Sequence, residues 1–128
     1  LFYKRAIPNF IKLTYLGRPL HITTNLQDSR QYLHCNDILF SILSASSIYA
    51  DDLFMIAGRK VSLKELITNI QMLLNRKVVY ELNITEKKSS YEYTIDCDKA
   101  QRILGFKQFV DIEQGLKSAI EIYKNITI

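Results

Sequence analysis

The spacing of apolar residues predicts a helix near the start of the chain. Pro8 stands at its beginning, Gly17 follows its last turn, and Pro19 prevents its continuation. Proline is favoured at the first position of a helix, where its missing N–H costs nothing, and glycine readily takes the left-handed conformation that ends one. The apolar positions between these signals are Phe10, Ile11, Leu13 and Leu16.

Capping signals predict further helices. Ser62 and Glu65 form a capping box, in which the serine hydroxyl accepts a hydrogen bond from the Glu65 N–H while the glutamate reaches back. Asp111 and Gln114 form a similar pair. The predicted helices run from Asn36 or Asp37 to about Ser46, from Ser62 to Leu74, from Lys99 to Leu104 between Asp96 and Gly105, and from Asp111 to Tyr123.

Strands are predicted between these helices. Residues 20–24, 78–82 and 91–95 have the composition of short strands. Residues 53–57 are all apolar and precede Gly58, which is typical of a strand buried on both faces. We therefore predict one mixed α/β (α+β) domain over residues 1–128, with a small mixed sheet and about four helices.

Composition and charge narrow the class of protein. The chain has 128 residues, of which 48% are hydrophobic and 23% charged, as expected of one globular domain rather than of a disordered or fibrous chain. The net charge of +4 suits an anionic ligand such as a phosphate, but it is too small to predict a nucleic-acid partner. No apolar run is long enough to span a membrane. Two cysteines, Cys35 and Cys97, without CxxC spacing favour a reducing, cytoplasmic compartment.

The residues show no catalytic centre. The chain has no glycine-rich phosphate loop and no metalloprotease or serine-hydrolase motif. A metal site of His34, Cys35, Asp37 and Cys97 is conceivable, but their spacing does not favour it. Nor do we expect His34 to activate Cys35, because neighbouring residues of a strand point to opposite faces. We predict no catalytic residue and no metal.

Tyrosines and lysines around residues 88–93 leave an alternative function open. Tyr91 and Tyr93 would share one face of a strand and could stack on bases, although a packed aromatic pair is the commoner arrangement. The alternative is a stand-alone basic interaction module that binds RNA or a protein partner. A domain kept only for assembly is a third reading.

A series of segments resembles, in the same order, the C-terminal half of NAD-dependent nucleotide-sugar epimerases and dehydratases, the extended short-chain dehydrogenase/reductase family. The likeness covers nearly the whole chain. The segments are 6–11 (AIPNFI), 17–20 (GRPL), 29–38 (SRQYLHCNDI), 54–58 (FMIAG), 61–66 (VSLKEL), 96–106 (DCDKAQRILGF), 111–116 (DIEQGL) and 122–123 (IY).

The resemblance implies a function for the chain. It implies the substrate-binding domain of such an enzyme without its dinucleotide-binding Rossmann half. The glycine-rich fingerprint and the Tyr-x-x-x-Lys pair of the family are absent from the sequence. The expected ligand is a nucleotide-sugar, no cofactor is expected in this chain, and NAD(P) is expected in the parent. The parent's reaction begins with hydride transfer from the sugar, and whether it epimerises, dehydrates or reduces is left open.

The resemblance also implies substrate-binding residues. Arg30 occupies the position of an arginine that contacts the diphosphate, for which a guanidinium is well suited. Arg5, Asn9 and Phe10 lie at the start of the first helix, near the nucleotide, although Phe10 is also a typical core residue. The strand at His21 and Ile22 corresponds to the segment that runs beside the base.

Departures from the family pattern concern the same site. Gln31 replaces an aspartate, and Glu86 stands where a second phosphate-binding arginine is usual. Lys87 or Lys88 could substitute for that arginine. The resemblance further implies that apolar residues around 38–43 and 53–56 pack on the missing half, so we expect the isolated chain to self-associate.

Overall fold

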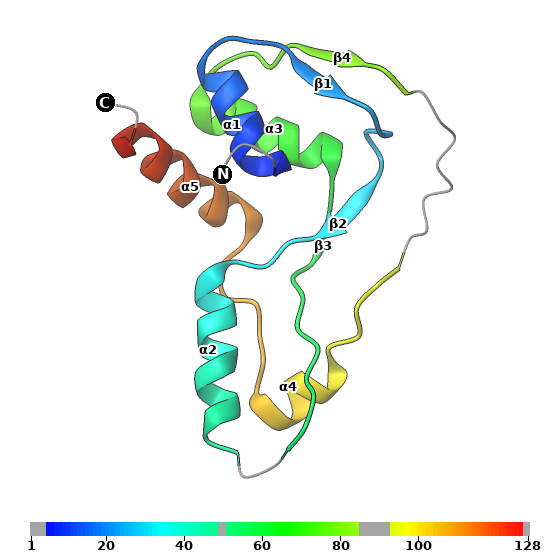
Figure 1. Ribbon diagram of the computed structural model, residues 1–128, viewed down its shortest axis with the longest axis vertical. Coiled ribbons are helices and arrows are strands. Elements are labelled where there is room, and N and C mark those ends of the chain that lie inside the picture. Colours follow the sequence, from blue (N-terminus) through cyan, green and yellow to red (C-terminus); the bar gives the residue numbers. More distant parts are fainter. Residues whose placement is uncertain (1–4, 49–50, 85–92, 127–128) are drawn as a thin grey trace.

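The structure is a computed structural model that describes residues 5–48, 51–84 and 93–126. Its elements are helices and short strands, mixed along the chain (Figure 1). They are α1 (Ala6–Tyr15), β1 (Leu20–Ile22), β2 (Ser29–Gln31), α2 (Cys35–Ser46), β3 (Lys60–Ser62), α3 (Leu63–Leu74), β4 (Tyr80–Leu82), α4 (Asp98–Leu104) and α5 (Ile112–Ile126).

The predicted mixed α/β fold class is confirmed, and each of the five segments predicted to be helical forms a helix in the described residues, one more than the total of about four. The strands form two small ladders instead of one sheet. Within the described residues, β1 pairs with β4 in parallel and β2 pairs with β3 antiparallel, with Arg30 opposite Val61. None of the helices in the described part of the chain is both long and apolar enough to cross a membrane.

The capping residues and glycines in the sequence predicted most helix ends correctly. The Ser62 hydroxyl accepts the Glu65 N–H at 3.1 Å, but the Glu65 carboxylate binds Arg59 instead of reaching back. Asp111 and Gln114 cap each other reciprocally at 2.8 and 3.2 Å. Helix α1 ends before Gly17, which has the expected positive φ, although it begins at Ala6, two residues before Pro8.

Two apolar clusters hold the elements together. The main cluster lies among α1, α3 and α5, which pack on one another at one end of the molecule (Figure 1). A smaller cluster lies at the other end, where α2 meets α4 (Figure 1). The β2–β3 ladder connects these two ends.

The prediction for residues 53–57 was wrong. In the structure they form no strand, and Leu53 and Met55 are exposed while Phe54 and Ile56 pack on the smaller cluster. The segment therefore buries only one of its two faces, since no second layer covers the other among the described residues. Residues 93–95 likewise form no strand, and residues 91–92 lie outside the described part.

Candidate functional site

Arg30 is placed on the surface by the β2–β3 ladder. Its side chain is exposed, and among the described residues no hydrogen bond or ion pair engages its guanidinium. The loop before β2 is fixed on the start of α3, where the N–H groups of Leu63 and Lys64 each donate, at 2.9 Å, to carbonyls of residues 28 and 26. Arg30 is thus an available cation on a backbone held from two sides.

Tyr32 lies two residues beyond Arg30 and is half-buried. Burial raises the pKa of its hydroxyl above the ordinary value, and the positive charge of Arg30 partly offsets this effect. The phenol therefore stays protonated through the physiological range and can donate a hydrogen bond beside the guanidinium.

The start of α1 holds three of the predicted site residues. Arg5 precedes the first turn, is exposed, and makes no side-chain cap hydrogen bond. No acidic residue lies in that turn, so its N–H groups keep their preference for negative charge. Asn9 is half-buried, whereas Phe10 belongs to the main core and is 8% exposed.

Strand β1 carries the remaining described candidates. Ile22 is buried in the main core, and its carbonyl accepts the Asn83 N–H at 2.9 Å. The side chain of His21 is exposed, and its Nδ1 lies 3.2 Å from a carboxylate oxygen of Glu81. Because neighbouring residues of a strand direct their backbone groups to opposite edges, the N–H and carbonyl of His21 face away from β4.

These candidates come from three elements, and no described hydrogen bond or ion pair joins Arg30 to Arg5, Asn9 or His21. Lys87 and Lys88, together with Glu86, lie outside the described residues. Of the two tyrosines in the alternative RNA-binding reading, Tyr91 also lies outside them, and Tyr93 is 72% exposed. All these residues remain predictions as ligand contacts.

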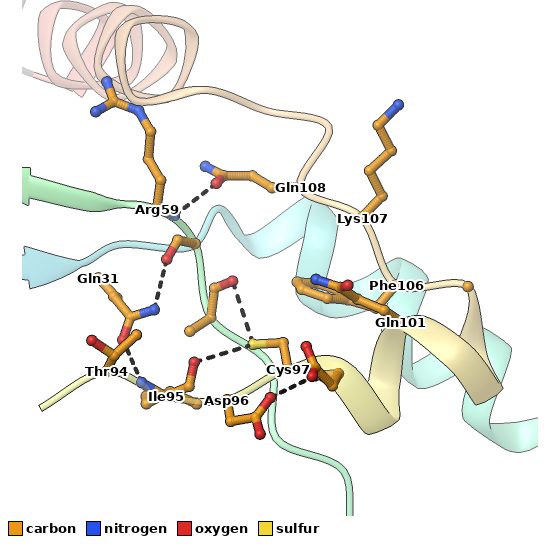
Figure 2. A pocket seen from close by; sticks show the side chains of 14 residues that line it. Gln31, Arg59, Thr94, Ile95, Asp96, Cys97, Gln101, Phe106, Lys107 and Gln108 are labelled. Atoms are coloured by element: carbon orange, nitrogen blue, oxygen red, sulfur yellow. Dashed lines mark hydrogen bonds between the residues drawn. The ribbon is translucent and has the colours of Figure 1, made fainter.

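The structure also contains a cleft of about 860 Å³ that the sequence did not predict (Figure 2). It lies between residues 57–59, 94–98 and 105–108, with Gln31 at its wall. Figure 2 shows the charged ends of Arg59 and Lys107 directed away from the hydrogen-bonded groups around Gln31 and Cys97. Asp96 and Asp98 line the cleft with these two cations, so it has no excess charge of either sign.

Glutamine side chains hold the walls of the cleft together. The Gln31 amide donates to the Gly58 carbonyl at 3.1 Å and accepts the Ile95 N–H at 2.7 Å. Gln108 accepts the Arg59 N–H at 2.9 Å. A hydrogen bond with the Glu65 carboxylate, 2.5 Å away, raises the pKa of the Arg59 guanidinium above its ordinary value. These contacts join segments that are far apart in the sequence.

Replacing Gln31 with leucine is expected to lower the free energy of unfolding by about 1–2 kcal/mol, because the Ile95 N–H and the Gly58 carbonyl lose their partner in a half-buried place. Urea denaturation compares the stability of this variant with that of a control, Gln27→Leu, in which an exposed glutamine before β2 is replaced in the same way. Equal stability of the two variants would show that the bridge contributes nothing.

Asp37 and the two cysteines do not form a metal site in the described part of the chain, where no group of three potential ligands occurs. The buried Asp37 carboxylate instead accepts the N–H groups of Phe109 and Val110, at 3.0 and 3.4 Å. Both cysteines are free thiols. His34 and Cys35 lie on no strand: His34 caps α2 by accepting the Asn36 N–H, and its Nδ1 is 3.9 Å from the Cys35 sulfur.

In sequence, this chain is similar to parts of two sugar-nucleotide enzymes. No family model matches. In sequence the chain is similar to dTDP-4-dehydro-6-deoxyglucose reductase of Escherichia coli, with 24% identity over 118 residues, which are 91% of this chain and 37% of the reductase. It is also 24% identical over 132 residues to UDP-glucuronate 4-epimerase of Thermodesulfobacterium geofontis, covering 96% of this chain and 41% of the epimerase.

Solved structures show the same likeness in fold. The structure of UDP-glucose 4-epimerase of Thermotoga maritima with UDP-glucose matches 95% of this chain and 40% of the epimerase chain. Its TM-score is 0.80 and the sequence identity is 22%. The structure of UDP-glucuronic acid 4-epimerase of Bacillus cereus in complex with UDP-glucuronic acid and NAD matches 97% of this chain and 41% of the epimerase chain. Its TM-score is 0.86 and the sequence identity is 16%. The chain spans about two fifths of the length of these proteins.

Proposed function

We propose that this chain, which is a relative of the nucleotide-sugar epimerases and dehydratases of the extended short-chain dehydrogenase/reductase family, is the nucleotide-sugar-binding domain of such an enzyme. Its role is to hold a nucleoside diphosphate so that the attached sugar faces a dinucleotide-binding part outside this chain. Residues 1–128 would then form one substrate-binding domain with no catalytic residue of its own. The proposed location is the cytoplasm.

The observation that carries the proposal is the available guanidinium of Arg30. A diphosphate presents pairs of oxygens that match the fork of N–H donors on arginine, and a guanidinium keeps its charge at every physiological pH. Arg30 has no competing carboxylate among the described residues, and the ladder with β3 fixes its backbone. The cleft lacks such an excess of positive charge, so we place the diphosphate at Arg30 and not in the cleft.

Further groups support this placement. The outward-facing backbone groups of His21 offer one donor and one acceptor, which suits the edge of a base. Arg5 adds a second exposed cation at the uncapped start of α1. Phe10 and Ile22 are buried, so we assign them the role of supporting α1 and β1 rather than of touching the ligand.

This chain's contribution to the reaction is positioning. Holding the nucleotide at a fixed place makes the reaction of the sugar with an oxidant bound outside this chain effectively intramolecular. This accelerates the chemical step. Relatives contain NAD, which takes up hydride. The present sequence has no glycine-rich loop of the kind that holds a dinucleotide, so we assign NAD(P) to the part of the enzyme outside this chain.

Replacing Arg30 with alanine is expected to weaken nucleotide-sugar binding roughly 10- to 100-fold, because a charge-assisted hydrogen bond pair to phosphate is lost. Thermal-shift titrations with UDP-, dTDP-, GDP- and CDP-sugars measure the change and identify the preferred base. Arg18→Ala is the matched control, since Arg18 is also an exposed arginine and lies between α1 and β1.

Two results would contradict the proposal. If the Arg30 variant bound nucleotide-sugars as tightly as wild type, the diphosphate would not bind at Arg30. Tight, salt-sensitive binding of RNA in preference to every nucleotide-sugar would instead favour the basic interaction module.

A further inference from the structure

The two apolar clusters of this molecule differ in size. The main cluster contains twelve buried residues, and the helices around it, α1, α3 and α5, pack on one another. The smaller cluster contains three buried residues, Ala100, Leu104 and Phe106, with partly buried side chains around them. Because burial of apolar surface is the dominant favourable contribution to folding, the smaller cluster stabilises its surroundings much less. We call α2 and α4 with the smaller cluster the α2–α4 unit, and α1, α3 and α5 with the main cluster the three-helix unit.

Helix α2 itself buries little apolar surface. Its buried residues are Asp37 and Ser41, which are 1% and 4% exposed. The Asp37 carboxylate accepts two backbone N–H groups of residues 109–110, and the Ser41 hydroxyl donates to the Asp37 carbonyl at 2.8 Å. Ala45 is the residue of α2 that packs on the smaller cluster, whereas the large apolar side chains of the helix are exposed. The attachment of α2 therefore depends on one carboxylate and on a few small apolar contacts.

The chain crosses between the two units in segments that are neither helix nor strand. Figure 1 shows them running from one end of the molecule to the other; they are residues 32–34, 51–59, 93–97 and 105–111. Gln31 and Gln108 join these segments through hydrogen bonds to backbone groups. Water can replace such bonds when the segments separate, so the junction adds less cooperativity between the units than a shared apolar core would.

We propose that the α2–α4 unit unfolds and refolds on its own while the three-helix unit stays folded. Proteins open in cooperative units, and a unit with few buried apolar contacts opens at a lower free energy than the core. The unit is thus an order–disorder element of the fold. Its opening should leave the proposed nucleotide site in place, because Arg5 and His21 lie on α1 and β1, and Arg30 is paired with Val61 of the main cluster.

Hydrogen exchange of the wild-type chain, followed by NMR at increasing urea concentration, is the first test. We expect the amides of α2 and α4 to share one opening and to exchange about a hundredfold or more faster than the slowest amides of α1, α3 and α5. The proposal does not rest on the proposed function, because this measurement needs no ligand.

Replacing Ile70 with alanine tests whether the units open separately. Ile70 is 1% exposed in the main cluster, so the change should accelerate exchange in the three-helix unit roughly tenfold or more. Exchange in α2 and α4 should keep its wild-type rate, because their opening does not expose residue 70. A molecule that opens as a whole would show the same acceleration in every helix.

Replacing Leu104 with aspartate should open the α2–α4 unit permanently. Leu104 is 8% exposed in the smaller cluster, where an unpaired carboxylate is strongly disfavoured. We expect the NMR signals of α2 and α4 to move to unfolded positions while those of α1, α3 and α5 keep their folded positions. Ile103→Asp is the matched control, since Ile103 is the neighbouring residue of α4 and is 47% exposed. It should keep every folded signal.

Three results would overturn the proposal. They are equal protection of all the helices in wild type, equal acceleration of all of them by Ile70→Ala, and complete unfolding of the Leu104→Asp variant. Nucleotide-sugar titration of the Leu104→Asp variant checks that the nucleotide site survives the opening, and loss of binding that wild type shows would contradict this. Absence of binding by wild type would count against the proposed function alone.

Discussion

Alanine at position 58 is expected to lower the free energy of unfolding by about 3 kcal/mol, the largest effect of this change among the four glycines of the chain. A Cβ on Gly58 would lie 1.7 Å from the Tyr32 carbonyl oxygen and 2.8 Å from its carbon. Both are backbone atoms, so no rotation of a side chain can relieve the overlap. Residues 57–59 would have to move away from residue 32, and the hydrogen bond from Gln31 to the Gly58 carbonyl would break with them.

Two other glycines supply controls for the same change. Gly115 lies within α5, where an added Cβ would meet the His34 ring at 3.4 Å, an ordinary contact. Alanine there should be neutral or stabilise by up to about 1 kcal/mol, since glycine is a poor helix former. Gly105 has open space but a φ of +66°, so alanine there should cost about 1 kcal/mol through backbone strain alone.

Urea denaturation of the three variants separates these causes. The expected order of stability is Gly115→Ala, then Gly105→Ala, then Gly58→Ala. If Gly58→Ala were as stable as Gly105→Ala, the close approach of residues 58 and 32 would not exist in solution.

Truncation of Asp37 to alanine is expected to destabilise the protein by about 3 kcal/mol. The carboxylate is 1% exposed and accepts the N–H groups of Phe109 and Val110, two part-buried donors that would lose their partner. Hydrogen bonds to a charged acceptor contribute more than neutral ones, and a donor left unpaired and shielded from water costs desolvation energy. The change should loosen the contact between α2 and residues 109–110 in particular.

Asp37→Asn separates the charge from the shape of the side chain. The amide keeps one acceptor oxygen, so we expect a loss of about 1–2 kcal/mol, smaller than that of alanine. Urea denaturation gives the energies, and hydrogen exchange at the Phe109 and Val110 amides reports the local contact. Unchanged protection of both amides in the alanine variant would show that Asp37 does not hold this segment.

Gly58 and Asp37 show which structural roles the sequence alone could predict and which it could not. Gly58 was recognised as the end of an apolar run, but its close approach to Tyr32 depends on the path of a chain segment 26 residues away. Asp37 was considered as a helix cap or a metal ligand, because a carboxylate at the start of a helix commonly fills such roles. Its actual partners are more than 70 residues further along the chain. No local pattern contains that information.

The cleft illustrates the same limit. Gln31 was noted only as a departure from the family pattern, yet its amide bridges the Gly58 carbonyl and the Ile95 N–H. No local sequence pattern marks Gln108, although its side chain accepts a hydrogen bond from the Arg59 N–H. A glutamine in an extended stretch has no signature that distinguishes a solvated side chain from a bridge between distant segments. The departure from the family pattern at Gln31, the last residue of β2, was the only available signal.

The sequence by itself determined the helices, the fold class and the resemblance to nucleotide-sugar enzymes. Capping pairs such as Asp111 with Gln114, and the left-handed glycines at 17 and 105, act within one turn of the chain, so short-range physics is sufficient to predict them. Only the tertiary structure decided the environment of the apolar segments. Residues 53–57 are apolar enough to be buried on both faces, and α2 carries its apolar residues outward. Burial depends on which layers are present to cover a segment, and that is a property of the assembled molecule rather than of any stretch of sequence.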